Sequence, residues 1–348
     1  MKMNRYFVFL SLLSLFFATA VFAQETPPLT RNVAPPTITL EVAVTPKSGG
    51  APVSGLQQTD FKILDNKASQ PITGFQAYSG GKTPVDVVLV IDAVNTTYQN
   101  IAFERGELGR FLTANGGQLA NPTSLAVVTD NGTQLQESFS TDGNAINDSL
   151  EKYTVALRDI RTSAGFYGAE ERYQLSLKAM NGLVTQVGAR PGRKIIIWLS
   201  PGWPLLSGPN VQYSEKGRQA IFAGIVDIST LLRQTRTTLY SVNSLGTAEG
   251  IGRTFYYQEF TKGVRKVSQA QPANLGIQVL ATQSGGLVLN STGVADMLHQ
   301  CMEDAQTYYE LTFAGQRADQ VDQYHEIEVQ VSRPGTMARS LQGYYAQP

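Results

Sequence analysis

The chain has 348 residues, with 28 basic and 28 acidic side chains, so its formal net charge is zero. This balance gives no electrostatic reason to expect nucleic acid or an anionic membrane surface as a partner. Hydrophobic residues make up 42% of the sequence, which allows a sizeable buried core, and the length favours one large domain with a smaller one.

The first 23 residues predict a cleavable export signal. Two basic residues near the start precede an apolar run at residues 6–20, and small residues flank a cleavage point before Gln24. The alternative is a membrane anchor, but the run is short for a helix of about 20 residues that crosses a bilayer. We therefore expect an exported protein, periplasmic or secreted, with no stable membrane span after the signal is removed.

Two short regions follow the signal. Residues 24–37 are rich in proline and lack periodicity, which predicts an extended leader. Residues 38–80 begin with alternating apolar residues from Ile38 to Val44, and further short strands are expected around Asp65 and Asn66. This β segment is too short for a core of its own, so we expect it to pack on the main domain.

Residues 84–348 alternate apolar runs with amphipathic stretches. Apolar runs and alternating stretches predict strands at residues 85–92, 194–200, 238–244, 287–290, 308–314 and 325–333, with a hairpin about Asn131–Gly132. Helical periodicity occurs at residues 101–112, 145–157, 170–187, 217–236, 273–286 and 294–308. This alternation predicts an α/β fold with a Rossmann-like, doubly wound and mostly parallel sheet. The last strands either add an antiparallel edge to that sheet or rejoin the N-terminal β segment.

The stretch VVLVIDAVNTT, residues 87–97, ends a buried strand with Asp92. In doubly wound sheets, ligands bind beyond the carboxyl ends of the strands. Three loops are expected there: DAVNTT after the first strand, RTSAGFYG before a helix, and LSPGWPLLSG after the strand KIIIWL.

Several stretches, taken in order, carry a family resemblance. They are SGLQQTDFKILDN followed by PITGF, then IDAVNTT, KIIIWLSPG, LATQSGG, YYELTF, YHEIEVQVSRPG and QGYYA. Their order and spacing across residues 37–346 resemble the von Willebrand factor A domain, and more closely the VWFA-related proteins of acidobacteria. The resemblance implies a Rossmann-like fold and, in many members, a metal-ion-dependent adhesion site with an Asp-x-Ser-x-Ser loop.

This sequence matches that metal motif only in part. Asp92 is present, Val94 stands at the first serine position, and Thr96 takes the place of the second serine. Pro201 replaces the aspartate of a later loop, and Thr162 or Ser163 could supply the threonine of the middle loop. We therefore expect at most a weak or vestigial Mg²⁺ site at Asp92 and Thr96, and no other cofactor. In the alternative, the Asp92 carboxylate accepts N–H bonds within its own turn.

Three residues near this loop are candidates for contact with a partner. They are Asn95, Thr97 and Trp203. Asn95 and Thr96 could also serve as turn residues and as the cap of the next helix. Trp203 either stands exposed as an anchor or folds back over the position that a metal would occupy. Cys301, the single cysteine, is expected to be buried and inert.

These features predict a non-enzymatic binding or scaffold module. Its partner would be an unidentified protein or a cell-envelope component, engaged by loops at the carboxyl end of the sheet without a tight metal. The alternative is divalent-cation-dependent adhesion through Asp92 and Thr96. A Gly-x-Ser-x-Gly elbow is absent and the sequence holds two histidines, which argues against a hydrolase. His325, in HEIEV, lacks the second histidine of a zinc-protease helix, and alternation predicts a strand there.

Overall fold

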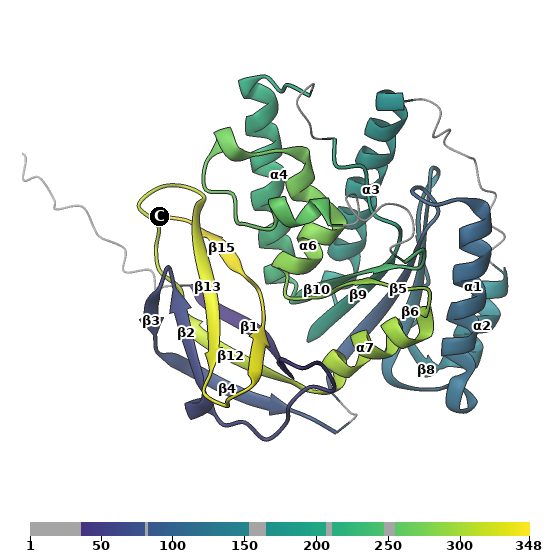
Figure 1. The fold of residues 1–348 in the computed structure, drawn as a ribbon, viewed down its shortest axis with the longest axis horizontal. Coiled ribbons are helices and arrows are strands. Elements are labelled where there is room, and N and C mark those ends of the chain that lie inside the picture. The colour runs from purple at the N-terminus through teal and green to yellow at the C-terminus, as the bar shows by residue number, and fades with distance from the viewer. Residues whose placement is uncertain (1–35, 81–82, 153–164, 207–210, 247–254) are drawn as a thin grey trace, which may run out of the picture. The chain divides into compact units, whose positions relative to one another are not determined.

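The computed structural model describes residues 36–80, 83–152, 165–206, 211–246 and 255–348. The predicted signal and all but the last two residues of the predicted leader lie outside these ranges, as do Thr162 and Ser163. A central sheet dominates the fold (Figure 1). Its strands are β5 (Val85–Asp92), β6 (Gln118–Thr129), β7 (Gly132–Leu135), β8 (Ser140–Asp142), β9 (Arg193–Leu199), β10 (Thr237–Asn243) and β11 (Val288–Asn290).

The strand order identifies the sheet as doubly wound. It runs β7-β6-β5-β9-β10-β11, and β8 pairs with β6 off this path. Strands β6, β5, β9, β10 and β11 are parallel, whereas β7 and β8 pair antiparallel to β6. If the six strands of the path are numbered along the chain, the order is 3-2-1-4-5-6, as in Rossmann folds. The predicted α/β, Rossmann-like, mostly parallel sheet is confirmed.

Helices cover both faces of this sheet because its central strands are apolar on both sides. In β5, Val88 and Val90 face one core, and Val87, Leu89 and Ile91 face the other. The first core receives α3 (Gly165–Gly188), α4 (Glu215–Gln234) and α6 (Ile277–Gln283). The second receives α1 (Tyr98–Thr113), α2 (Gly143–Lys152) and α7 (Val294–Gln306).

The two ends of the described chain build a β-sandwich beside the α/β part. One sheet has the order β14-β1-β12-β4, and the other β15-β13-β2-β3. The early strands are β1 (Thr37–Pro46), β2 (Phe61–Asp65), β3 (Ala68–Gln70) and β4 (Ile72–Tyr78), and the late strands are β12 (Tyr308–Ala314), β13 (Gln323–Val331), β14 (Thr336–Arg339) and β15 (Gly343–Ala346). Of the two placements left open for the last strands, the structure shows that they rejoin the N-terminal segment.

Polar contacts fasten the sandwich to the α/β part. Arg236, just before β10, pairs with Glu41 of β1 and Glu310 of β12, which lie directly opposite each other in their sheet. Two carboxylates that lie opposite each other in a sheet repel. The Arg236 guanidinium offsets this repulsion and connects the sandwich to the α/β part. Arg339 of β14 donates to Asp304 of α7 at 2.7 Å.

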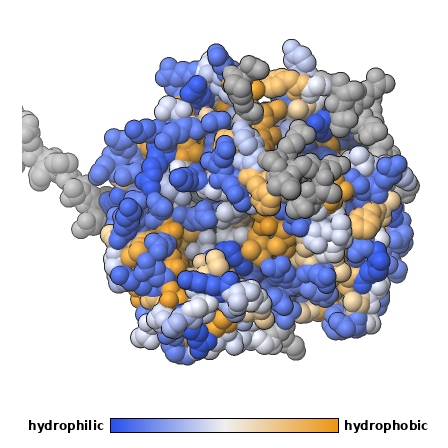
Figure 2. All heavy atoms as spheres, viewed as in Figure 1, coloured by the Kyte–Doolittle hydropathy of each residue, from blue (hydrophilic) through white to orange (hydrophobic). Residues whose placement is uncertain are grey.

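Within the sandwich, His325 lies in β13, the predicted strand, and its Nδ1 lies 2.8 Å from Oδ1 of the buried Asp65. The face shown in Figure 2 mixes hydrophilic surface with separate hydrophobic patches. None of the helices in the described ranges has the length and apolar character that crossing a membrane requires. Cys301 is fully buried, and burial raises the pKa of its thiol well above the usual value, so its thiolate is disfavoured.

Candidate functional site

The topological switch point of the sheet lies between β5 and β9, where the strand order reverses. Asp92 is the last residue of β5, and Ser200 follows the last residue of β9. Both side chains are fully buried. The sequence therefore places a carboxylate and a hydroxyl at the position where such sheets bind ligands.

The Asp92 carboxylate is held by four N–H donors of the protein. Its Oδ1 accepts from the backbone N–H groups of Val94 at 3.0 Å and Asn95 at 3.1 Å. Its Oδ2 accepts from Asn95 Nδ2 and from Trp198 Nε1, both at 2.9 Å. The bonds from Val94 and Asn95 are those expected of an Asx turn. The bond from the Trp198 indole connects this turn to β9.

These contacts leave the carboxylate little capacity for a metal ion. A carboxylate offers about four lone-pair sites, and four donors already use them here. Val94 packs in the hydrophobic core at 5% exposure, so the first serine position of the family motif holds an apolar side chain with no atom that could bind an ion. No cluster of three His, Cys, Asp or Glu side chains suited to a metal occurs among the described residues. The donor set at Asp92 fits a tightly held Mg²⁺ poorly.

The next three residues of the loop have different roles. The Asn95 amide bridges Asp92 and Ser176 of α3, to which it donates at 2.7 Å. Thr96 Oγ1 is buried and has no hydrogen-bond partner among the described residues. Thr97 is exposed and caps α1 by accepting from Asn100 N–H at 3.4 Å. The cap is therefore Thr97 rather than Asn95 or Thr96, and contact of Thr97 with a partner stays a prediction.

Trp203 does not stand in solvent as an exposed anchor would. It is 4% exposed and belongs to the same core cluster as Val94. Its ring meets Trp198 edge to face, with centroids 5.3 Å apart, and Trp198 in turn bonds Asp92. The expectation of an exposed side chain is corrected, because the ring is buried against Trp198 in the hydrophobic core. That Trp203 covers the position of a metal stays a prediction.

Glu104 is a buried acid at this edge that the sequence interpretation overlooked. It faces the core from α1, and its Oε1 accepts from Ser244 Oγ at 2.7 Å just beyond β10. Its Oε2 has no partner among the described residues. Burial raises the pKa of Glu104 to about 7, the bond from Ser244 opposes that rise, and the charge of Asp92 adds to it. Spacing could have revealed it, since position 104 falls three residues after Ile101 and four before Leu108 on the apolar face.

Exposed aromatic side chains occur in the first turns of two helices that follow the carboxyl end of the sheet. Because α1 follows β5 and α3 leads back to the start of β9, both helices begin at the carboxyl end of the sheet (Figure 1). Seven large hydrophobic side chains are exposed among the described residues, and four of them are aromatic residues near these helix starts. These four are Tyr98 (68% exposed), Phe103 (40%), Phe166 (48%) and Tyr167 (82%). Aromatic residues are enriched in protein interfaces.

Comparison with known proteins gives no close relative. No family model matches the chain, and no curated protein matches it. Among solved structures, the human COPII-coat protein Sec24c is 9% identical with a TM-score of 0.34, over 82% of this chain and 49% of that one. The PilB minor pilin from Streptococcus sanguinis is 10% identical with a TM-score of 0.36, over 69% and 64%.

A von Willebrand factor A domain is also among the similar structures. It is the SpRpn10 VWA domain, 13% identical with a TM-score of 0.28, over 62% of this chain and 94% of that one. The chain thus spans about half of the first of these structures and just under two thirds of the second. Such low scores carry no argument about function. They also give no support for the resemblance to the VWFA-related proteins of acidobacteria. The fold rests on the chain's own strand order, which is that of a doubly wound α/β sheet.

Proposed function

We propose that this chain is a non-enzymatic interaction module of the von Willebrand factor A type. It binds another protein or a cell-envelope component through the loops and helix starts at the carboxyl edge of its sheet. The observation that carries the proposal is the Asp92 carboxylate, whose four bonds go to the protein itself. The Asp92 side chain thus stabilises the turn at the carboxyl edge of the sheet, and binding of a partner at this edge needs no metal.

The surface above this turn supports the choice of a protein partner. Tyr98, the first residue of α1 after the loop that Asp92 holds in place, is 68% exposed, and Tyr167 near the start of α3 is 82% exposed. Tyrosine offers a large, rigid contact area and a hydroxyl for hydrogen bonding, at a small cost in side-chain entropy. Export, as the first 23 residues predict, belongs to this proposal and would place the partner in the periplasm or outside the cell.

A comparison of two serine variants tests the location of the binding edge. Partners captured from envelope extracts by the full chain are compared between Tyr98→Ser and Val321→Ser. Val321 lies between β12 and β13 in the sandwich and is 67% exposed, so it matches Tyr98 in exposure. The proposal expects the specific partner to be lost with Tyr98→Ser and retained with Val321→Ser. Equal retention by both variants would place the interface elsewhere.

Divalent-cation-dependent adhesion is the second candidate function. It is favoured by the buried Oγ1 of Thr96 and Oε2 of Glu104, both oxygens without a partner among the described residues, since oxygen atoms are the ligands that Mg²⁺ prefers. Capture of the same partner with and without a chelator separates the two candidates. Loss of the partner on chelation would favour the cation-dependent function.

A further inference from the structure

Strand β4 forms an open edge of the β-sandwich (Figure 1). The strand orders place β4, β14, β3 and β15 at the edges of the two sandwich sheets. Among these four, β4 has seven residues, whereas the others have three or four. A long edge strand presents a row of unpaired backbone groups, which is a template for pairing with another strand.

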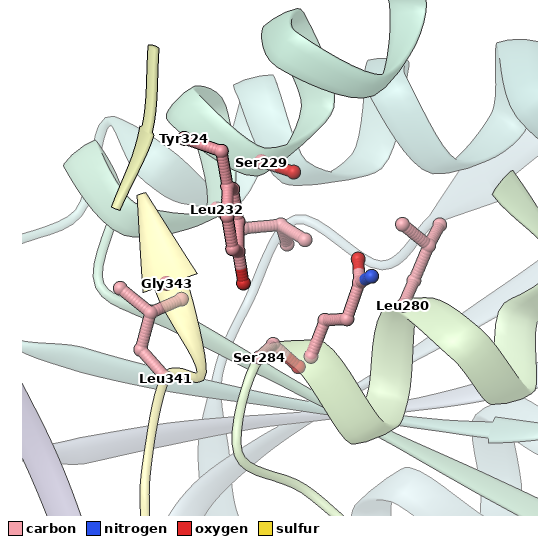
Figure 3. A pocket seen from close by; sticks show the side chains of 8 residues that line it. Ser229, Leu232, Leu280, Ser284, Tyr324, Leu341 and Gly343 are labelled. Carbon is pink, nitrogen blue, oxygen red and sulfur yellow. The ribbon is translucent and has the colours of Figure 1, made fainter. Parts of the chain in front are cut away.

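The other sandwich edges are short or lie against the α/β part. Leu232 of α4 and Gly343 of β15 line one hollow of roughly 20 Å³ (Figure 3), which has room for about one water molecule. Helix α4 therefore lies against the β15 edge. Arg339 of β14 donates to the carbonyl oxygen of Gly285 and to Asp304, both at 2.7 Å. Strand β3 has only three residues.

The register of the sheet shows which backbone groups of β4 point outward. Just beyond β12, the N–H of Gly315 donates to the carbonyl oxygen of Pro36 at 2.7 Å, so odd-numbered residues of β12 direct their backbone groups toward β1. Even-numbered residues of β12 direct theirs toward β4. Their partners in β4 are Gly74, Gln76 and Tyr78. The N–H and C=O groups of Phe75 and Ala77 therefore point away from β12, into the open edge.

The protein itself covers little of this edge. The side chains of Gln76 and Ala77 are exposed. The carbonyl oxygen of Ala77 accepts from Gln76 Nε2 at 3.3 Å, a long bond that a neighbouring strand can replace. At the start of β4, the carbonyl oxygen of Ile72 accepts from Gln58 Nε2 at 3.2 Å, and the register shifts there. The regular open stretch thus runs over residues 74–78.

The edge is complementary to a second copy of itself. Residues 68–80 contain no charged side chain, so two copies that pair here bring no like charges together. In an antiparallel pairing centred on Gln76, Phe75 of each copy lies opposite Ala77 of the other. These are the two residues whose backbone groups point outward, so each such pair can exchange two N–H···O bonds.

We propose that two copies of the chain associate through their β4 edges, paired antiparallel about a two-fold axis at Gln76. The pairing joins a four-stranded sheet of each copy into one continuous sheet. Because each copy contributes one short strand, we expect less buried area than the roughly 1,200–2,000 Å² of stable interfaces, and hence a reversible dimer. This contact uses other residues than the carboxyl edge, so it stands or falls independently of the proposed function.

Sedimentation velocity of the full chain between about 1 and 500 μM tests the proposal. We expect the weight-average mass to rise with concentration from one chain toward two. Gln76→Lys places two ammonium groups opposite each other, so the dimer should be at least about tenfold weaker and recover in part at high salt. Ala77→Pro removes an outward N–H without touching the β12 ladder, and it should also weaken the dimer.

The control and a cross-linking experiment check the register. Gln134→Lys changes an exposed glutamine of β7, an edge strand of the central sheet, and should associate as the wild type does. Gln76→Cys brings two Cα atoms to about 4.5 Å across the axis, which a disulfide can span. Cys301 is buried, so it does not compete. We expect rapid covalent dimerisation of Gln76→Cys on oxidation and much slower cross-linking of Gln134→Cys.

Three results would overturn the proposal. They are a single-chain mass of the wild type at every concentration, association unchanged in both Gln76→Lys and Ala77→Pro, and equally fast cross-linking of the two cysteine variants. The first result would leave the β4 edge to an extended segment of a different protein. Thermal melting checks that each variant is folded. If Ala77→Pro fails to fold, Gln76→Lys and its salt dependence carry the same expectation.

Discussion

Replacing Glu104 with glutamine is expected to stabilise the protein at pH 8 and to change its stability little at pH 4.5. The carboxyl group is fully buried and bonds Ser244 Oγ at 2.7 Å. Burial is the main cause that raises its pKa from 4.5 to about 7. Glutamine keeps the size of the side chain and a group that can bond Ser244, but it carries no charge to desolvate.

The sign and the size of the effect follow from proton linkage. Between about pH 4.5 and 7 the unfolded chain has lost the proton of Glu104 while the folded chain retains it, so rising pH favours unfolding. Below this window both states are protonated, and above it both are ionised. At about 1.36 kcal/mol for each pKa unit, the wild type loses roughly 3 kcal/mol of unfolding free energy across the window through this group.

Urea denaturation of the wild type and Glu104→Gln at pH 4.5 and pH 8 measures this difference. Other titrating groups act alike in both proteins, so they cancel when the variant is compared with the wild type at one pH. The variant should gain about 1–3 kcal/mol relative to the wild type on going from the lower to the higher pH. A difference that is the same at both pH values would refute the assignment of a raised pKa to this buried acid.

Three further substitutions test the Asp92 turn, the cap of α1 and the close packing before β11. Trp198→Phe removes the N–H that bonds Asp92 at 2.9 Å and should lower the unfolding free energy by about 1.5–3 kcal/mol; a loss below about 0.5 kcal/mol would show that the bond matters little. Thr97→Ala removes the cap of α1 and should cost about 1 kcal/mol in the same urea assay, whereas an unchanged midpoint would contradict the cap. Gly286→Ala places a Cβ against a backbone carbonyl oxygen of β10, so it should cost several kcal/mol or abolish folding, and a well-folded variant with wild-type melting would contradict that contact.

Local patterns in the sequence were sufficient to predict the α/β part. The apolar run of β5, the turn at Asn131–Gly132 and the helical spacing in α3 each depend on neighbours within the same stretch. The partners of the last strands could not be chosen in this way. Strand β12 lies between β1 and β4, which are more than 200 residues earlier in the sequence, and alternation specifies a strand without specifying the strand it joins.

The candidate site could be predicted in place but only partly in detail. The end of an apolar strand locates Asp92 at the sheet edge, yet the donor from Trp198 depends on the side-by-side register of β5 and β9. Burial of Trp203 depends on that same indole, because its ring packs on Trp198. Glu104 could have been found earlier, since an acid on the apolar face of a predicted helix is an exception that calls for an explanation.

Titration of the purified chain with Mn²⁺ or Mg²⁺ by calorimetry tests most directly whether Asp92 serves the fold rather than an ion. The four N–H donors at its carboxylate predict no saturable binding in the micromolar range. They also predict that Asp92→Asn lowers the unfolding free energy whether or not a chelator is present. Saturable micromolar binding that Asp92→Asn abolishes would contradict a metal-independent site.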